Sequence, residues 1–394
     1  MIFDELPEGK AILLRVDLNT GLVNGEPQDS PRFTQAAETV RALLKKKSRV
    51  VIIAHQGRPG DNDYTSLEKH AALLSKRAKK KIKFVPDLFG PVALAAIKKL
   101  SPGKALLLEN TRFYAEEAAV LKDYSQTLFV KQLSPLFDYY VNDAFSVSHR
   151  SQASLVGFPK VLPSVAGPHL AREVEFLSRL RSAERPVVYC LGGAKLEECL
   201  DLSNYALTAN KADYLLVSGV FGDLLLLASG KDMGLKAKWL EEKGFTKHLP
   251  ACAKLWAEYK QKLVLPVDWA FADADGFRVE TREPSKAPKP VFDIGRDTVA
   301  LFKRYLKDAR TVFFKGPCGR YEEPAFEMGT QMLLKEIAKT NAVTVIGGGD
   351  SGAALLKLGL KEKNYGHVCT AGGAMLDYLT GKALPGLDAL NPST

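Results

Sequence analysis

Arginine, histidine and acidic side chains recur in the first part of the chain wherever a short apolar segment ends. Such segments include AILLRVDLN, RVVIIAH and DYYVND. The polar residues at or just after the segment ends are Asp17, Asn19, His55, Arg58, Arg112, Asp143, His149 and Arg150. Arginines that converge with a histidine hold phosphate and carboxylate groups through forked hydrogen bonds, which lysine cannot copy. One such arginine could form only a surface ion pair, but their recurrence favours a site for a small organic dianion or trianion.

The second part of the chain has glycine-rich segment ends instead, namely LGGAK, SGV, KGPCG, IGGGDS and TAGG. Backbone N–H groups of glycines, next to a helix N-terminus, suit a polyphosphate. Residues 347–352 (GGGDSG) also match the dinucleotide-binding spacing G-x-G-x-x-G. However, the next segment, HVCTAGG, lacks the acid that a dinucleotide fold requires. An oxidoreductase that uses a dinucleotide is therefore a weak alternative, and no G-x-x-x-x-G-K-[ST] motif occurs.

Short β-branched segments alternate with helical patterns in two successive series, the second beginning at VVYCLGG. This alternation predicts parallel sheets with helices on both faces, and 394 residues exceed what one hydrophobic core usually serves. We expect an α/β fold with two doubly wound parallel-sheet domains joined by a helix and a hinge. The expected domains are residues 1–168 and 185–375, with a connecting helix over 169–184.

Charge and composition exclude several other classes of protein. The first 165 residues contain 24 basic and 17 acidic residues, a net charge of +7, so this half should attract anions. The lysine runs at 45–47 and 76–83 lack interleaved aromatic residues, which argues against nucleic acid. We expect no membrane span and no secretion signal. Five scattered cysteines without metal-ligand spacing predict reduced thiols and a cytoplasmic location.

Eight motifs, in the same order along the whole chain, resemble those of phosphoglycerate kinases, and the segments AHQGRP, DYT and HRSQASLVG resemble the archaeal branch in particular. The motifs are RVDLN, AHQGRP, LENTRF, VNDAFSVSHRSQASLVG, LGGAK, KGPCGRYEEPAF, IGGGDS and TAGGAMLDYLTGKALPGLDAL. The resemblance implies reversible phosphoryl transfer between ATP and the carboxylate of 3-phosphoglycerate, which gives 1,3-bisphosphoglycerate and ADP with Mg²⁺ as cofactor. It also implies two lobes that close by a hinge, with residues 376–394 packing back on the N-terminal domain.

For the N-terminal domain, the resemblance implies a binding site for 3-phosphoglycerate. Asp17 and Asn19 would hold the hydroxyl and carboxylate end of the substrate, and Arg32 would bridge the attacking carboxylate and the transferred phosphoryl group. The 3-phosphate would be bound by His55, Arg58, Arg112 and Arg150. His149 could equally be a packing residue.

For the second domain, the resemblance implies a nucleotide site. Lys195 would face the phosphates, and Asp350 would coordinate the metal of Mg-ATP. Gly192, Gly193, Gly349 and Ser351 would line the same site, Pro317 and Glu322 would hold adenine and ribose, and Gly372 and Gly373 would receive the transferred group. Glu323 could replace Glu322 as the ribose ligand.

The nucleophile needs no general base, because a carboxylate is already ionised at pH 7. The transition state needs alignment and positive charge, which Arg32, Lys195, Mg²⁺ and the amides of Gly372 and Gly373 would supply.

Two positions depart from the family pattern. Cys199 stands where many members have a second lysine, and Lys315 replaces the asparagine of W-N-G-P. We hypothesise that Lys315 restores the missing charge; alternatively, it points to solvent. Because of these departures, a nucleotide-binding pseudoenzyme of the same fold is a second hypothesis. The expected partners are small molecules, not nucleic acid or membranes, and the chain is expected to be a monomer or homodimer.

Overall fold

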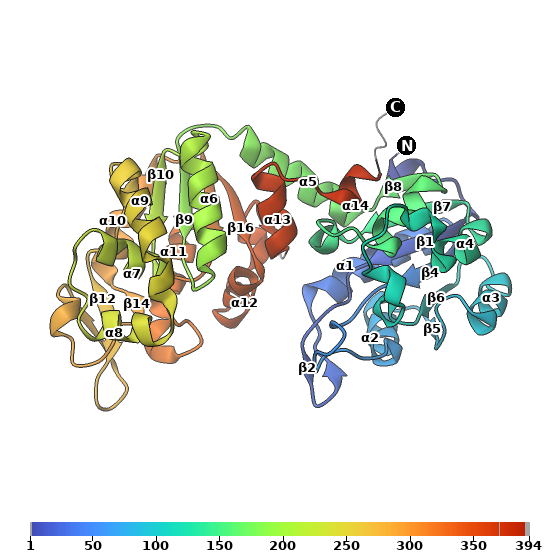
Figure 1. The fold of residues 1–394 in the computed structure, drawn as a ribbon, viewed down its shortest axis with the longest axis horizontal. Coiled ribbons are helices and arrows are strands. Elements are labelled where there is room, and N and C mark those ends of the chain that lie inside the picture. The colour runs from blue at the N-terminus through green and yellow to red at the C-terminus, as the bar shows by residue number, and fades with distance from the viewer. Residues whose placement is uncertain (1, 370, 391–394) are drawn as a thin grey trace. The chain divides into compact units, whose positions relative to one another are not determined.

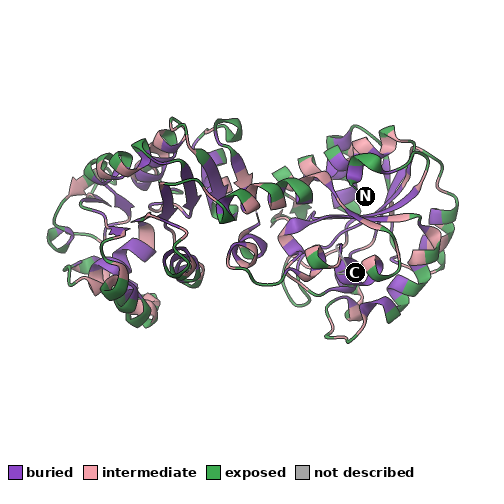
Figure 2. Ribbon diagram, turned by 90° about the horizontal axis from the view of Figure 1, so that it is seen from above, coloured by how far each residue is buried: buried purple, intermediate pink, exposed green. Residues whose placement is uncertain are grey.

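The computed structural model describes residues 2–369 and 371–390, and it divides into two compact units. Unit 1 comprises Met1–Glu175 and Lys382–Thr394, and unit 2 comprises Phe176–Gly381. The division falls within helix α5 (Pro168–Arg181). In each unit, buried strands form the centre and helices lie on both faces of the sheet (Figure 1, Figure 2).

Unit 1 contains a six-stranded parallel sheet in the order β5-β6-β4-β1-β7-β8. Its strands are mostly apolar because both faces of the sheet are covered; in Ala11–Val16 all six residues are buried, and Arg15 is the one charged residue among them. Alternate residues serve opposite faces: Ile12 and Leu14 pack in one core with residues of α1 and α2, such as Val40 and Leu74. The strands are β1 (Ala11–Val16), β4 (Arg49–Ile53), β5 (Ile82–Val85), β6 (Ala105–Leu108), β7 (Tyr139–Asp143) and β8 (Ser164–Ala166). The other elements are the hairpin β2 (Leu22–Val23) and β3 (Glu26–Pro27), and helices α1 (Pro31–Lys45), α2 (Glu68–Ala78), α3 (Pro91–Lys98), α4 (Leu128–Leu133) and α14 (Pro385–Asp388).

Unit 2 contains a second six-stranded parallel sheet, in the order β11-β10-β9-β15-β16-β17. Its strands are β9 (Val187–Leu191), β10 (Tyr214–Val217), β11 (Leu263–Val264), β15 (Thr311–Lys315), β16 (Val343–Gly347) and β17 (His367–Cys369). Its helices are α6 (Leu196–Thr208), α7 (Gly219–Ala228), α8 (Leu235–Glu242), α9 (Leu249–Tyr259), α10 (Arg296–Lys307), α11 (Met328–Ile337), α12 (Gly349–Lys357) and α13 (Gly372–Leu379). The α/β prediction with two parallel sheets is confirmed.

A small antiparallel sheet in unit 2 was not expected from the sequence. It has the order β13-β12-β14, with β12 (Trp269–Ala272), β13 (Arg278–Thr281) and β14 (Asp293–Ile294). These strands have two to four residues, too few to give a clear alternation of apolar and polar side chains.

The strand orders define where a ligand should bind in each unit. In unit 1 the chain builds β4, β6 and β5 on one side of β1 and then returns to add β7 on the other side. In unit 2 it builds β10 and β11 on one side of β9 and returns to add β15 on the other. Ligands of open α/β sheets bind at such a reversal, outside the carboxyl ends of the strands. The ends of β1 and β9 are therefore the places to look for a site.

The segment from Lys382 onward belongs to unit 1. Within it, the N–H of Gly386 donates to the carbonyl oxygen of Ser148 over 2.8 Å, and the Asn142 side chain donates to the carbonyl oxygen of Gly386 over 3.1 Å. None of the helices described in the structure is both long enough and apolar enough to cross a membrane.

Candidate active site

Asp17 and Asn19 lie at the carboxyl end of β1, where a network of hydrogen bonds fixes both side chains. Asp17 forms an ion pair of 2.9 Å with Arg32 from the first turn of α1 and accepts hydrogen bonds from the Asn19 N–H and the Ser146 hydroxyl. The Asn19 side chain accepts a hydrogen bond of 2.9 Å from the Gly57 N–H. Burial raises the pKa of Asp17, but the positive charge of Arg32 and the hydrogen bonds outweigh it and lower the pKa to about 2. Asp17 is therefore a fixed, ionised carboxylate.

Arginines from three different loops of unit 1 converge. Arg112, in the turn after β6, is 7% exposed, and Arg150 follows β7. Burial lowers the pKa of Arg112 to about 10, and the nearby positive charges of Arg150, Arg15 and Arg58 add to this effect. Burial also lowers the pKa of Arg150, as does the charge of Arg58. These guanidinium groups repel one another, and an anion bound among them would relieve that repulsion.

His55 follows β4 and is 2% exposed. One of its ring nitrogens, Nδ1, lies 3.1 Å from Nη2 of Arg15. Burial lowers the pKa of His55 well below its ordinary value, with a further contribution from Arg15. The imidazole is therefore neutral, and because arginine can only donate, His55 accepts this hydrogen bond at Nδ1 and carries its proton on Nε2.

Arg15 and Glu117, which the sequence motifs did not indicate as site residues, are both fully buried in unit 1. Arg15 donates a hydrogen bond of 3.0 Å from Nε to the hydroxyl of Ser154, and that hydroxyl in turn donates to Glu117 over 2.5 Å. The available signal was an arginine inside the apolar run AILLRV, since charged residues are almost never fully buried unless paired. Asp143, by contrast, accepts the N–H groups of His169 and Leu170 at the start of α5. His149 accepts a hydrogen bond of 3.2 Å from Arg150.

The glycine-rich loops of unit 2 interlock at the ends of β9 and β15. Gly192 N–H donates to the carbonyl oxygen of Lys315 over 2.9 Å, and Gly193 N–H donates to that of Pro317 over 2.8 Å. Gly316 has φ +85°, and a Cβ atom on it would lie 2.1 Å from the carbonyl oxygen of Gly192. Only glycine fits such an approach of two backbones. Gly316 N–H also donates to the Ser351 hydroxyl over 2.9 Å, which ties these loops to α12.

The starts of α6, α12 and α13 meet in a small polar pocket. It is lined by residues 192–195, Glu198, residues 315 and 316, residues 347–351 and Gly372. Lys195 Nζ lies 2.8 Å from Asp350 Oδ2, and Lys315 Nζ lies 2.5 Å from Glu198 Oε2. Three helix N-termini and two lysines, each lysine paired with a carboxylate, supply N–H donors that suit phosphate oxygens.

Lys315 is 4% exposed, so the alternative that it points to solvent is wrong. It is the last residue of β15, and its side chain reaches the first turn of α6, where Glu198 holds it. Cys199 next to Glu198 is fully buried, and its thiol donates to the carbonyl oxygen of Gly192 over 3.2 Å. Burial raises the pKa of Cys199 to about 11, so the thiol is neutral.

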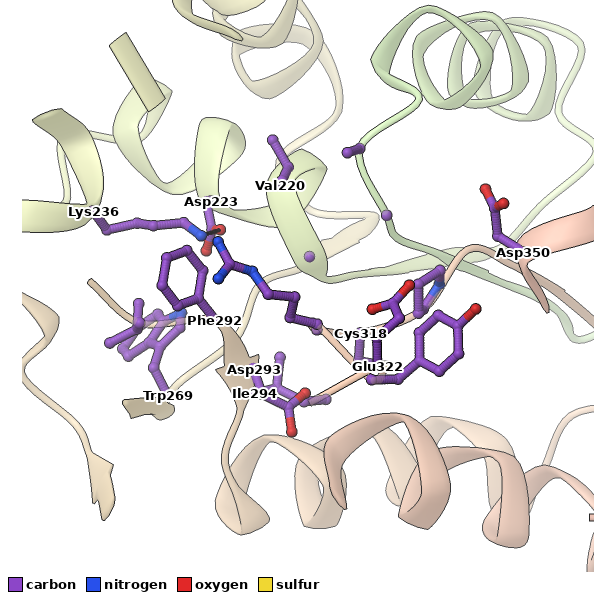
Figure 3. A pocket seen from close by; sticks show the side chains of 18 of the residues that line it. Val220, Asp223, Lys236, Trp269, Phe292, Asp293, Ile294, Cys318, Glu322 and Asp350 are labelled. Carbon is purple, nitrogen blue, oxygen red and sulfur yellow. Dashed lines mark ion pairs between the residues drawn. The ribbon is translucent and has the colours of Figure 1, made fainter. Parts of the chain in front are cut away.

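A larger pocket of about 400 Å³ begins at Lys195 and Asp350 and continues between α7, α8 and the loop after β15. Figure 3 shows Asp350 on one side of it, Glu322 and Cys318 in the middle, and Lys236 with Asp223 on the far side. Glu322 lines this pocket, whereas Glu323 forms an ion pair of 3.0 Å with Arg320. Pockets of this volume suit small molecules of nucleotide size.

These features define a class of protein: a two-unit α/β protein with converging arginines in one unit and a glycine-lined pocket in the other. A family model described as phosphoglycerate kinase matches residues 3–382. Phosphoglycerate kinase 1 of Methanosarcina acetivorans is 41% identical over 97% of this chain and 93% of its own length. The phosphoglycerate kinase of Methanopyrus kandleri is 40% identical over 97% of this chain and 95% of its own length.

Comparison with solved structures gives the same family. The crystal structure of phosphoglycerate kinase from Pyrococcus horikoshii OT3 superposes with a TM-score of 0.92 at 36% identity and covers 99% of this chain and 98% of its own. The chain therefore belongs to the phosphoglycerate kinase family, kinases that transfer a phosphoryl group between ATP and 3-phosphoglycerate in glycolysis. The predicted family is confirmed, and the comparisons give no support to the pseudoenzyme hypothesis.

Proposed function

We propose that unit 1 binds 3-phosphoglycerate and unit 2 binds Mg-ATP. The observation that carries the first assignment is the convergence of Arg58, Arg112 and Arg150. Burial, together with the charges of neighbouring arginines, lowers the pKa of Arg112 and of Arg150. A phosphate dianion bound by these arginines restores charge balance. His55, with its proton on Nε2, donates a neutral hydrogen bond to the same phosphate.

Asp17, Asn19 and Arg32 are proposed to orient the other end of the substrate. Asp17 accepts a hydrogen bond from the substrate hydroxyl, because it is an ionised carboxylate held in place by Arg32. Arg32 also donates to the carbonyl oxygen of Asn19 over 2.5 Å, so its guanidinium group is fixed at two points. Preorganised charge of this kind stabilises a transition state without reorganising during the reaction.

In unit 2, we assign the polar pocket to the phosphates and the larger pocket to the nucleoside. Gly192, Gly193, Gly349 and Ser351 surround the phosphates, while Pro317 and Glu322 contact the base and ribose. Lys195 and Lys315 are proposed to contact the transferred phosphoryl group, and the N–H groups of Gly372 and Gly373 at the start of α13 receive its oxygens.

Both lysines form ion pairs in the free protein. Lys195 pairs with Asp350, and Lys315 pairs with Glu198. Phosphate oxygens would compete with these carboxylates for the ammonium groups, which keeps nucleotide binding moderate and directs the lysine charge to the transition state, where more negative charge develops.

Asp350 fits the requirements of a magnesium ligand. Its side chain is 54% exposed, and it lies at the start of α12 beside Ser351. Mg²⁺ in kinases is usually held by one or two carboxylates together with substrate phosphates and waters. When bound, Mg²⁺ would neutralise charge on the phosphates of ATP. We therefore assign Asp350 as its protein ligand.

A cytoplasmic location is part of the same proposal, because all five cysteines are free thiols and all are buried. A monomeric or homodimeric state and the closing of the two lobes stay predictions.

A spectrophotometric assay tests the proposal directly. ATP and 3-phosphoglycerate are supplied with Mg²⁺, and 1,3-bisphosphoglycerate is detected through its reduction by a coupled NADH-dependent dehydrogenase. Turnover that requires all three components is expected. The Arg112→Met variant should then raise the KM for 3-phosphoglycerate at least tenfold and leave the KM for ATP within twofold; equal effects on both would contradict the division of roles.

A further inference from the structure

The far end of the large pocket contains charged groups for which phosphate binding has no use. We define this base end by Val220, Asp223, Lys236, Trp239, Trp269, Phe292, Ile294 and Arg320, all of which line the pocket. Asp223 on α7 and Lys236 on α8 form an ion pair of 3.2 Å, with the side chains 9% and 3% exposed. Replacing a buried ion pair by apolar residues often leaves the folded protein at least as stable. A buried ion pair inside a ligand pocket is therefore a candidate for recognition.

Aromatic rings surround the cations of the base end. Lys236 Nζ lies 4.4 Å from the ring centre of Trp239 and 4.5 Å from that of Phe292. The guanidinium carbon of Arg320 lies 3.6 Å from the ring centre of Phe292. A flat nucleobase can stack in such a place on a ring or on a guanidinium plane.

The base end offers both hydrogen-bond donors and hydrogen-bond acceptors. Besides Lys236 and Arg320, Trp269 contributes an indole N–H that is buried and, among the described residues, has no hydrogen-bond partner. Asp223 supplies the opposing acceptor. Asp293 also lines the pocket: its Oδ2 accepts hydrogen bonds from Arg278 and from the Gly329 N–H, whereas its buried Oδ1 has no hydrogen-bond partner among the described residues.

Guanine matches this arrangement better than adenine does. The edge of guanine presents two acceptors, O6 and N7, which suit lysine and arginine, together with N1–H and N2–H donors, which suit a carboxylate. Adenine replaces O6 by an amino group, whose hydrogens would face the cationic donors. A site built to bind one hydrogen-bonding pattern rejects the other, because its buried polar groups are then left unpaired.

We propose that the base end selects 6-oxopurines, so that this enzyme uses GTP at least as efficiently as ATP. The inference rests on the proposed function, because it assumes that the phosphates bind beside Lys195 and Asp350. Those two residues and the base end line the same pocket. Asp223 and Lys236 would then act as specificity-determining residues.

The first experiment compares kcat/KM for ATP, GTP and ITP in the same assay. A GTP value equal to or above the ATP value supports the proposal, and a lower value overturns it. ITP keeps O6 and N1–H but lacks the 2-amino group, so it is expected within threefold of GTP. An ITP value closer to that of ATP than to that of GTP would contradict recognition through O6.

Equilibrium binding separates this inference from the proposed function. Trp239 and Trp269 line the pocket, so their fluorescence should change on binding, and Trp256→Phe on α9 removes the remaining tryptophan signal. GDP is expected to bind at least as tightly as ADP. If no nucleotide supports turnover, the proposed function fails, but the ratio of the two dissociation constants still decides the base preference.

Variants identify the responsible residues. In the double variant Asp223→Leu, Lys236→Met, both charges disappear together and no unpaired ion is left behind. We expect its GTP-to-ATP ratio of kcat/KM to fall at least tenfold. The matched control, Lys254→Met with Glu258→Leu, removes an exposed ion pair on α9 and should leave the ratio unchanged. Should the double variant not fold, Arg320→Val at the more exposed position should still lower the ratio at least threefold; an unchanged ratio would overturn the proposal.

Discussion

The ammonium group of Lys315 lies 2.5 Å from a carboxylate oxygen of Glu198. The first belongs to the end of β15 and the second to the first turn of α6. Because β9 and β15 are neighbours in the sheet, the loop after one and the helix after the other face each other. A cation therefore reaches the small polar pocket from the end of β15, although Cys199 occupies the position on α6 where many family members have lysine.

Replacing Lys315 by Met should lower kcat at least tenfold and change nucleotide affinity little. The proposed contact is made mainly to the transferred group, and one cationic donor is worth roughly 2 to 4 kcal/mol of barrier. Steady-state kinetics and ADP titration measure the two effects. Lys335→Met on α11 removes an exposed lysine as a control. Unaltered turnover would eliminate the role of Lys315.

The same substitution leaves the Glu198 carboxylate without its lysine in the phosphate pocket. The double variant Lys315→Met, Glu198→Gln separates the effect of losing the cation from the effect of leaving the Glu198 carboxylate unpaired. If the cation matters, the double variant stays at least tenfold slower than the unaltered enzyme. Full recovery of kcat would show instead that the unpaired Glu198 causes the defect.

The acid stability of unit 1 should depend on Asp17. Its pKa in the folded state is about 2, against an ordinary 3.8, so its contribution is present above about pH 4 and is lost as the pH falls through 2. The full contribution is roughly 2 kcal/mol, of which about 1.5 kcal/mol disappears between pH 5 and pH 2.5. Urea unfolding at the two pH values should show this loss in the unaltered protein and a correspondingly smaller loss in Asp17→Asn. Equal losses would contradict the lowered pKa.

Gly316 and Gly276 form a matched pair for measuring the contact between the glycine-rich loops that follow β9 and β15. Their φ angles are +85° and +84°, but a Cβ atom on Gly316 would meet the Gly192 carbonyl at 2.1 Å, whereas one on Gly276 would meet nothing within 4 Å. Both alanine variants incur the strain of a positive φ. Gly316→Ala should lose about 2 kcal/mol more unfolding free energy than Gly276→Ala, and only Gly316→Ala should weaken ADP binding. Similar values for the two variants would show that the loops can separate without cost.

Asp350→Asn should lower kcat/KM for Mg-ATP at least a hundredfold, because an amide is a weaker magnesium ligand than a carboxylate. The direct readout is calorimetric: Mg²⁺ should strengthen ADP binding in the unaltered protein and do so much less in the variant. Glu362→Gln, an exposed acid of the same unit, is the control. An unchanged magnesium effect would assign the metal to another ligand.

Much of the fold and of the candidate site follows from local sequence patterns. Mostly apolar strands such as Ala11–Val16, each followed by a helical pattern, predict parallel sheets, because such segments suit burial on both faces. Residues at strand ends then share one edge of a sheet, which is why Asp17, His55 and Arg112 could be grouped without a structure. The motifs also sufficed to identify the family.

The tertiary structure decided which charged groups face each other. Nothing near Lys315 in the chain indicates Glu198, and nothing near Asp223 indicates Lys236, since each pair joins separate elements through strand order and helix packing. The buried Arg15 and its link to His55 likewise depend on two strands lying side by side. Sequence periodicity predicts which face of a helix or strand is buried, because that pattern lies within a single element. The partners, distances and pKa values of a charged group depend on elements that are remote in the chain. Only the folded arrangement brings these elements together.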